Sequence, residues 1–294
     1  MNATRLAARG RIVEWGPTRP RPLIMGIVNL SIDSFSGDGV GDTGSALALA
    51  RRQVEAGADV IDIGAESAGT QRGPISEAEE TAALLAFVTR FAEEAAQWQP
   101  RDAGQLFPPL LSVNTWRPAV VRPVLEAGGD LLNDIGGLPG DENARVCAET
   151  GAALLIMHSV GEPKVPHTHV TYPDVLETVD RFFEEKLALA ARAGVPRDAT
   201  VLDPGIDFAK QRDDNLRLYA HLESFHHFGR PLLLPVSRKT VIGDILGLPA
   251  PQRDAGTIAC VMSGLIHGAH LFRVHNVRAA WEALRVGSAV LEYR

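Results

Sequence analysis

The sequence predicts a single (β/α)8 barrel, and three observations lead to that prediction. Short apolar runs recur along the chain, helical patterns lie between most of them, and the runs number about eight. Apolar strands that alternate with helices indicate a parallel sheet that is buried on both faces. A chain of 294 residues has room for two domains of roughly 150 residues, but eight strand–helix units fit one barrel of about 250 residues.

The apolar runs predict strands at 23–28, 58–63, 110–113, 131–133, 153–157, 200–202, 232–236 and 270–274. Helical patterns follow at 44–56, 119–127, 175–193, 213–224 and 257–268. Ser76 is expected to begin a further helix, because Ser76-Glu77-Ala78-Glu79 has the pattern of a capping box. The segment 99–109 is too short to separate domains and predicts a loop between a helix and a strand.

We expect residues 1–21 to form an N-terminal leader and residues 22–294 to form the barrel. Within the leader, residues 11–15 are a candidate strand that covers the bottom of the barrel. The chain shows no separate linker and no second core. It is therefore interpreted as one domain with a short leader.

Composition excludes several classes of protein. Hydrophobic residues make up 45% of the chain and charged residues 22%, which is enough material for a large core. The net charge of −7 argues against a nucleic-acid surface spread over the whole chain. Cys147 and Cys260 cannot form a disulfide framework, and no apolar run reaches the ~18 residues of a membrane span. We expect a cytoplasmic protein without nucleic-acid or membrane partners.

Polar side chains stand at the end of nearly every predicted strand. In barrels of this kind the active site lies at the carboxyl ends of the strands. One such residue is usually a cap or a loop residue, but polar residues at successive strand ends favour a small polar substrate. The residues concerned are Asn29, Asp33, Asp62, Glu66, Asn114, Asn133, Asp134, His158, Asp203, Ser237, Arg238, Lys239, Arg273 and His275.

Two groups among these residues indicate particular ligands. Arg238, Lys239, Arg273 and His275 follow the last two strands, where barrels often bind phosphate. The alternative is that these cations form salt bridges with neighbouring carboxylates. The second group is Asn114, Asn133 and Asp203, whose amide and carboxylate groups suit a flat heterocycle, although this pattern alone decides little.

Other common catalytic motifs are missing from the sequence. It contains no dinucleotide fingerprint after the first strand, no P-loop, no nucleophile elbow and no zinc helix. His226-His227 and the pair His167 and His169 lack a third ligand at suitable spacing, so they are interpreted as solvated histidines.

The strand-end motifs resemble those of the dihydropteroate synthases, a family of pterin-binding barrels. The resemblance covers residues 22–285 and lies in segments that occur in the family's order. These segments are 24–36 (IMGIVNLSIDSFS), 57–67 (GADVIDIGAES), 111–115 (LSVNT), Asn133-Asp134, Met157-His158, 202–206 (LDPGI), 236–239 (VSRK) and 273–275 (RVH).

The resemblance implies a transferase of folate synthesis. Such an enzyme joins a hydroxymethyl-dihydropterin diphosphate to p-aminobenzoate and releases diphosphate, and sulfonamides act at the aminobenzoate pocket. It also implies bound Mg²⁺ and a homodimer that pairs through the late helices, for which 257–268 and a helix around Trp281 are the candidate contact faces. Lys239, Arg273, Asp33 and Phe35 would serve catalysis, the last two from a loop that closes over the site. The implied binding residues are Asn114, Asn133, Asp203 and Lys239 for the pterin, Asn29 (also the Mg²⁺ ligand), Arg273 and His275 for diphosphate, and Ser67, Arg72 and Thr240 for aminobenzoate.

The chain departs from the family pattern around the expected site. Asn114 replaces a usual Asp and lacks its negative charge. In the second loop a Ser-Thr-Arg-Pro motif becomes Ser67-Ala68-Gly69-Thr70, and Arg72 is a candidate replacement for the arginine. The remaining differences are Ser36-Gly37-Asp38-Gly39 in the first loop, Asp207, Ala209 and Pro235 in place of glycines, Thr240 in place of Ser, and Asn276 in place of Asp.

Three functions therefore stay open at the level of sequence. The first is a divergent dihydropteroate synthase. The second is a pterin-binding paralogue that is non-catalytic or altered in specificity, which Asn114 and the changed second loop favour. The third is a methyl-transfer relative that binds a reduced folate, and the retained diphosphate residues Asn29, Arg273 and His275 count against it.

Overall fold

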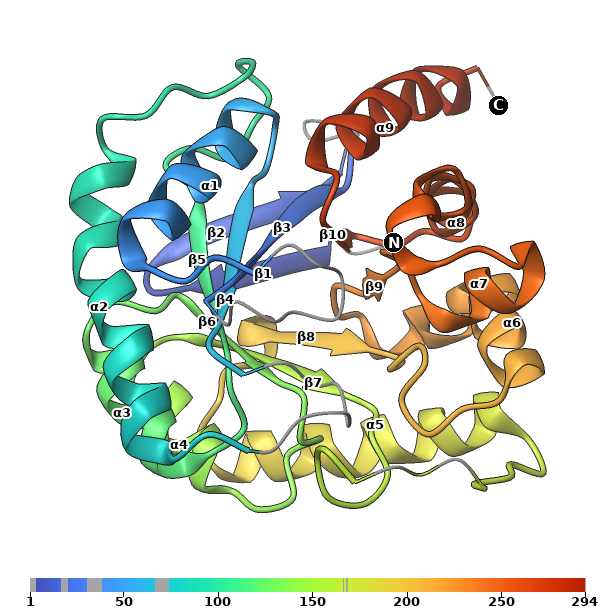
Figure 1. The fold of residues 1–294 in the computed structure, drawn as a ribbon. Coiled ribbons are helices and arrows are strands. Elements are labelled where there is room, and N and C mark those ends of the chain that lie inside the picture. The colour runs from blue at the N-terminus through green and yellow to red at the C-terminus, as the bar shows by residue number, and fades with distance from the viewer. Residues whose placement is uncertain are drawn as a thin grey trace.

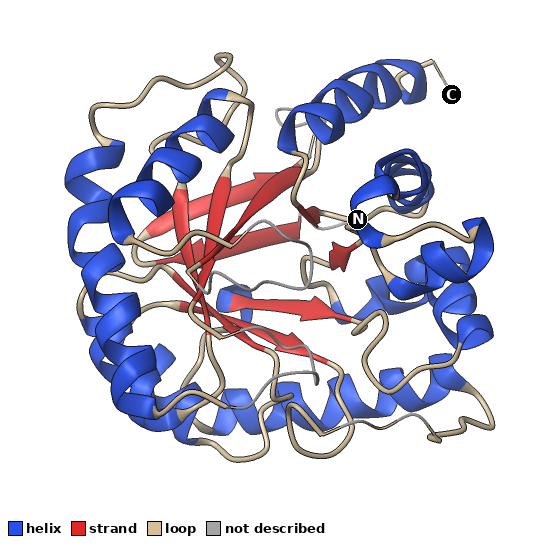
Figure 2. Cartoon of the chain, in the orientation of Figure 1, coloured by secondary structure: helices blue, strands red, loops and turns tan. Residues whose placement is uncertain are grey.

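The computed structural model describes residues 4–16, 21–30, 39–66, 74–165, 167 and 169–293. Within them, eight parallel strands form one sheet that is surrounded by helices (Figures 1 and 2). The strand order is β8-β7-β6-β5-β4-β3-β10-β9. The strands are β3 (Leu23–Asn29), β4 (Val60–Gly64), β5 (Leu110–Asn114), β6 (Leu131–Asp134), β7 (Ala153–Met157), β8 (Thr200–Asp203), β9 (Leu233–Pro235) and β10 (Leu271–Val274).

The sheet closes into a barrel between its first and last strands. A parallel bridge joins Leu202 to Leu232, and the Leu202 N–H donates to the Pro231 carbonyl over 3.0 Å. Closure confirms the predicted TIM barrel, and each predicted strand range overlaps an observed strand. The apolar runs located these strands because both faces of every barrel strand are buried.

Helices cover the outside of the barrel. They are α1 (Thr43–Glu55), α2 (Glu77–Ala95), α3 (Pro118–Glu126), α4 (Glu142–Thr150), α5 (Val175–Arg192), α6 (Arg212–Ala220), α7 (Thr240–Leu246), α8 (Asp254–Ile266) and α9 (Val277–Leu291). Ser76 and Glu79 form the predicted capping box before α2. Two helices, α4 and α7, were not predicted; they have nine and seven residues, and their N-cap side chains make no capping bond. The helix predicted at 213–224 ends at Ala220, and a 3₁₀ segment (Leu222–Phe228) follows.

Two apolar layers hold the barrel together. Side chains such as Leu23, Met25 and Val60 point into the barrel and pack with one another. Their sequence neighbours Ile24 and Ile61 point outward and pack under the helices. This alternation follows from the two-residue period of a strand, which sends successive side chains to opposite faces.

A small antiparallel hairpin lies at the amino-terminal end of the strands. It consists of β1 (Thr4–Ala8) and β2 (Arg11–Trp15). Leu6 and Val13 of the hairpin belong to the same apolar cluster as the inward-facing side chains of the barrel. The hairpin therefore covers the bottom of the barrel interior. The division of the chain at residues 21 and 22 stays a prediction.

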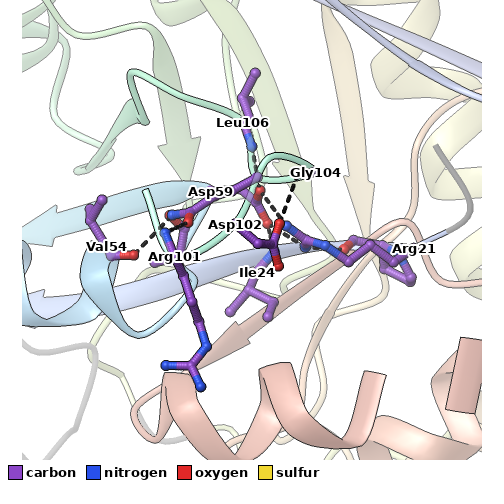
Figure 3. Close-up of polar contacts among 11 residues, drawn as sticks. Arg21, Ile24, Val54, Asp59, Arg101, Asp102, Gly104 and Leu106 are labelled. Atoms are coloured by element: carbon purple, nitrogen blue, oxygen red, sulfur yellow. Dashed lines mark hydrogen bonds and ion pairs between the residues drawn. The ribbon is translucent and has the colours of Figure 1, made fainter. Parts of the chain in front are cut away.

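A buried ion pair fastens the start of β3 to the start of β4 (Figure 3). Arg21 donates through both terminal nitrogens to the Asp59 carboxylate, at 2.8 and 3.0 Å. The backbone N–H groups of Ile24 and Leu106 donate to the same carboxylate at 2.9 and 2.8 Å. The Asp59 side chain is completely buried, so these donors replace the water it loses.

Within the described residues, no helix is long and apolar enough to cross a lipid bilayer.

Candidate active site

The predicted polar residues meet at the carboxyl ends of the barrel strands. Asn114 is the last residue of β5, and it pairs in register with Gly64 of β4 and Asn133 of β6. Asp203 ends β8 and pairs with Met157 of β7. Residues that lie far apart in sequence therefore share one end of the barrel, as the strand-end pattern predicts.

Asp62 connects two of the predicted binding residues. Its side chain is completely buried on β4, and Arg273 of β10 donates from Nε to its Oδ2 over 2.7 Å. The Asn133 amide donates to both carboxylate oxygens at 3.2 and 3.3 Å, and the Ser112 hydroxyl donates to Oδ1 at 2.6 Å. Asp62 thus orients Arg273 and Asn133 together. Sequence analysis recorded it only as a polar strand residue, although a charged residue inside an apolar strand was a usable signal.

Asn114 presents an acceptor that no described residue uses. Its Oδ1 atom is buried and has no hydrogen-bond partner within the described part of the chain. A buried amide oxygen of this kind is normally satisfied by protein, water or a ligand. An N–H group on a bound heterocycle would satisfy it.

Asp203 is a buried carboxylate at the end of β8. Burial raises its pKa to about 6, against the opposing effect of the Gly205 N–H and of nearby Lys239. The Gly205 N–H donates to its Oδ1 at 2.7 Å. A Cβ on Gly205 would lie 2.0 Å from the His158 carbonyl oxygen, and the residue has φ of +69°, so only glycine fits this turn.

Lys239 lies just before α7 and faces the loop that follows β8. Its Nζ donates to the Ile206 carbonyl over 2.8 Å and stands 5.1 Å from the centre of the Phe208 ring. Burial lowers the pKa of Lys239, while the carboxylates of Asp207 and Asp203 act in the opposite direction. This lysine is held by a carbonyl, an aromatic face and neighbouring negative charge.

Lys210 is a further buried cation that sequence analysis did not select. Its Nζ donates to His158 Nδ1 at 2.8 Å, to the Gly205 carbonyl at 2.9 Å and to the Phe208 carbonyl at 3.1 Å. Burial lowers the pKa of Lys210 to about 7 and that of His158 to about 2. His158 is therefore neutral and accepts the bond, and Lys210 ties the loop after β8 to the end of β7.

The predicted cationic group carries less charge than its residue types suggest. His275 lies with Nδ1 2.7 Å from the Ser237 hydroxyl oxygen, and burial lowers the pKa of His275 to about 3. Arg238 donates to Asp254 over 2.9 Å, and Arg273 is paired with Asp62. The salt bridges considered as the alternative are thus formed, although the side chains do gather after β9 and β10.

A second charged network lies beside the loop after β4. Glu66 is buried and pairs with Arg117 at 2.6 Å and with Lys164 at 2.7 Å. Arg117 also pairs with Glu80 of α2. The network joins the loops after β4 and β7 to the start of α3. Nothing in the local sequence of Arg117 or Lys164 indicated it, because the four residues of the network meet only in the folded chain.

Four predicted site residues lie outside the described residues: Asp33, Phe35, Ser67 and Arg72. Two others sit at the edge of the site. Asn29 ends β3 and is partly exposed, and Thr240 is the exposed first residue of α7.

Within the described ranges, no group of three or more His, Cys, Asp or Glu side chains is arranged to hold a metal ion. His227 pairs instead with Asp180 at 3.2 Å.

The fold and the strand-end residues define a class of barrel enzymes. Residues 25–275 match the family described as pterin binding enzyme. The chain belongs to this family.

Dihydropteroate synthases are among the relatives to which the chain is similar. It is 35% identical to the dihydropteroate synthase of Escherichia coli strain K12 over 92% of both chains, and 34% identical to that of Bacillus subtilis over 93% of this chain and 90% of the relative. A crystal structure of the Yersinia pestis dihydropteroate synthase with a sulfonamide drug superimposes with a TM-score of 0.87. It is 34% identical, and the match covers 99% of this chain and all of that one. The Coxiella burnetii enzyme in complex with pteroic acid has a TM-score of 0.82 at 28% identity.

Proposed function

We propose that the protein is a dihydropteroate synthase: a transferase of folate synthesis that condenses a hydroxymethyl-dihydropterin diphosphate with p-aminobenzoate and releases diphosphate. The observation that carries the proposal is the whole-chain match to dihydropteroate synthases in a barrel whose strand ends hold Asn133, Asp203, Lys239 and Arg273 together. The pteroic acid and the sulfonamide named for the matching structures correspond to the product class and to an analogue of the second substrate.

The pterin edge would be bound by the buried amide and carboxylate groups. Ionised Asp203 accepts two N–H donors of a pterin, and Asn114 Oδ1 offers an acceptor without a described partner. Asn133 already donates through Nδ2 to Asp62, so its Oδ1 is the side-chain atom that would accept from a ligand donor. A neutral amide at position 114 binds a donor less strongly than the carboxylate that the family usually has.

Departure of diphosphate would be assisted by Arg273 and His275. Arg273 uses Nε for Asp62, which leaves its terminal N–H groups to donate to phosphate oxygens. His275 is neutral, and the tautomer in which Nδ1 accepts the Ser237 hydroxyl carries its proton on Nε2, where it would donate to the diphosphate. Stabilising the leaving anion lowers the barrier most, because charge separates in the transition state.

The residues also fit Mg²⁺ that arrives with the substrate. Mg²⁺ keeps several waters and usually binds through one or two carboxylates plus substrate phosphates, so no all-protein cage is needed. Here the amide oxygen of Asn29, at the end of β3, would be the protein ligand and the diphosphate would supply the negative charge. Bound there, the ion would neutralise negative charge on the diphosphate. We further propose that Asp33 and Phe35 close over the site, that Ser67, Arg72 and Thr240 line the aminobenzoate path, and that a cytoplasmic homodimer is the working form.

The alternative is a pterin-binding paralogue that is non-catalytic or altered in specificity. Asn114 and the changed second loop favour it, because both differ from the synthase pattern at the expected site. Incubating the protein with pterin diphosphate, p-aminobenzoate and Mg²⁺ separates the two functions. We expect release of diphosphate and formation of dihydropteroate. Pterin binding without turnover at high protein concentration would support the alternative and reject the synthase.

A further inference from the structure

The loop after β8 reaches the first turn of α7 through one side chain, that of Asp207. The Asp207 carboxylate accepts the backbone N–H of Thr240 through Oδ2 and lies within 3.4 Å of the Val241 nitrogen through Oδ1. The residue in the N-cap position of α7 is Lys239, whose side chain makes no capping bond. A lysine has no acceptor atom, so Asp207 supplies from another loop the cap that the local sequence lacks.

Asp207 is itself held firmly in this place. It has φ of 68°, in the left-handed region, which Asp tolerates better than most residues. Its backbone N–H donates to Asn215 Oδ1 at 2.8 Å, and Asn215 Nδ2 returns a bond to the carboxylate at 3.3 Å. Asn215 is buried on α6, so Asp207 links α6 to α7, which lie beside each other (Figure 1).

The two neighbours of Asp207 contact Lys239 directly. Ile206 accepts a hydrogen bond from Lys239 Nζ, and the Phe208 ring lies below the same atom. Three successive residues of one loop therefore surround the lysine with a carbonyl, a negative charge and an aromatic face. We propose that Asp207 is a positioning residue: its carboxylate fastens the start of α7 to the loop after β8 and so sets where Lys239 and Thr240 stand in the barrel mouth.

Asp207 also contributes charge at Lys239. Among the groups that act on this lysine, its carboxylate opposes the effect of burial on the pKa and favours the protonated amine. The other charged or titratable groups that face Lys239 are Asp203 on β8, Lys210 on the same loop, Arg273 on β10, His275 directly after β10, and Arg253 directly before α8, which donates to the Lys239 carbonyl. Removing Asp207 leaves Asp203 as the remaining carboxylate in this set.

Two substitutions separate the capping contact from the charge. Asp207→Gly removes both, whereas Asp207→Asn keeps an acceptor oxygen and a tolerated left-handed backbone but removes the charge. Ala209→Gly is the matched control, because Ala209 lies in the same loop at φ of 52° and contributes only its backbone carbonyl to the described hydrogen bonds. Amide hydrogen exchange at residues 240–241 measures the contact. The pH dependence of acetic anhydride labelling at Lys239, followed by mass spectrometry, measures the charge.

We expect faster exchange at residues 240–241 in Asp207→Gly, near-normal exchange in Asp207→Asn, and a pKa of Lys239 lowered by about one unit in both variants. Ala209→Gly should leave both readouts unchanged. Unchanged exchange in Asp207→Gly, or an unmoved titration of Lys239 in both variants, would overturn the proposal. We also expect kcat/KM to fall about tenfold in Asp207→Gly. Unlike the other two readouts, this expectation depends on the proposed function. If the unmodified protein shows no turnover, that function fails, while exchange and labelling still decide the role of Asp207.

Discussion

Arg273 Nε donates to Asp62 Oδ2 over 2.7 Å, although 211 positions separate the two residues in the sequence. The same carboxylate accepts from Asn133, so one buried group orients an arginine assigned to diphosphate and an amide assigned to the pterin. The contact joins β4 to β10 across β3, and it exists because β10, the last strand in the chain, pairs with β3, the first strand of the barrel. Three predictions concern this site, and a fourth concerns the ion pair of Arg21 and Asp59 at the amino-terminal end of the barrel.

Asp62→Asn should impair catalysis and folding together. Removing the negative charge leaves Arg273 mostly buried without a counter-charge, which costs about 3 kcal/mol in the free energy of unfolding. We expect kcat/KM for the pterin diphosphate to fall about 100-fold. Ser112→Ala is the control, because it removes one donor to Asp62 and keeps the pair with Arg273. Urea unfolding and steady-state kinetics measure both effects, and equal losses in the two variants would contradict the role given to Arg273.

Asn114→Asp should strengthen pterin binding. The substitution places a charged acceptor where a buried amide oxygen has no described partner, and a charge-assisted bond is roughly twice as strong as a neutral one. We expect the dissociation constant of a pterin to fall about tenfold or turnover to rise. Fluorescence titration and kinetics of the variant check this. Loss of activity would show that Asn114 is adapted to this chain rather than a handicap.

Pterin affinity should decrease in acid. The Asp203 carboxylate must be ionised to accept pterin N–H groups, and burial raises its pKa to about 6. As the pH falls below that value the carboxylate gains a proton, so affinity drops by about tenfold per unit. Titrating a pterin from pH 8 downward, at about one-unit steps, measures this. Asp203→Asn should bind weakly and flatten the profile.

Asp134 provides the control for that profile. Burial also raises its pKa to about 6, but its carboxylate accepts from Asn143 and from the Gly136 N–H instead of facing the mouth. Asp134→Asn should therefore keep the acid loss of affinity. If the pH profile flattens in Asp134→Asn and persists in Asp203→Asn, the titrating carboxylate is Asp134, and the assignment to Asp203 is contradicted.

Arg21→Met should destabilise the protein without altering the reaction. Asp59 would remain buried with its main cationic partner removed, and breaking such a pair costs about 3–5 kcal/mol. The ion pair lies at the amino-terminal ends of β3 and β4, whereas the proposed site residues lie at the carboxyl ends of the strands. Arg5→Met serves as the surface comparison, since the exposed pair of Arg5 and Glu14 contributes less than about 1 kcal/mol. Thermal unfolding measures both, and a loss of kcat in folded Arg21→Met would contradict this assignment.

Much of the architecture could be predicted from the sequence. Apolar runs located each barrel strand, because a strand buried on both faces needs apolar side chains at successive positions. Ser76 and Glu79 marked the start of α2 through local bonds alone. The two helices that were not predicted, α4 and α7, begin without a capping bond from the N-cap side chain. α7 has an interior glycine, Gly243, and its cap comes from Asp207, a residue in a different loop.

The sequence by itself determined which residues stand at the strand ends, since strand position depends on local pattern. Only the tertiary structure decided their partners and charge. Pairing of β10 with β3 brought Arg273 to Asp62, and burial made His275 neutral although its type suggested a cation. Pairing and protonation depend on distance and on loss of water, and both are properties of the folded chain. The cationic group expected after the last two strands is therefore a set of oriented donors, with Arg238 and Arg273 each held by a carboxylate.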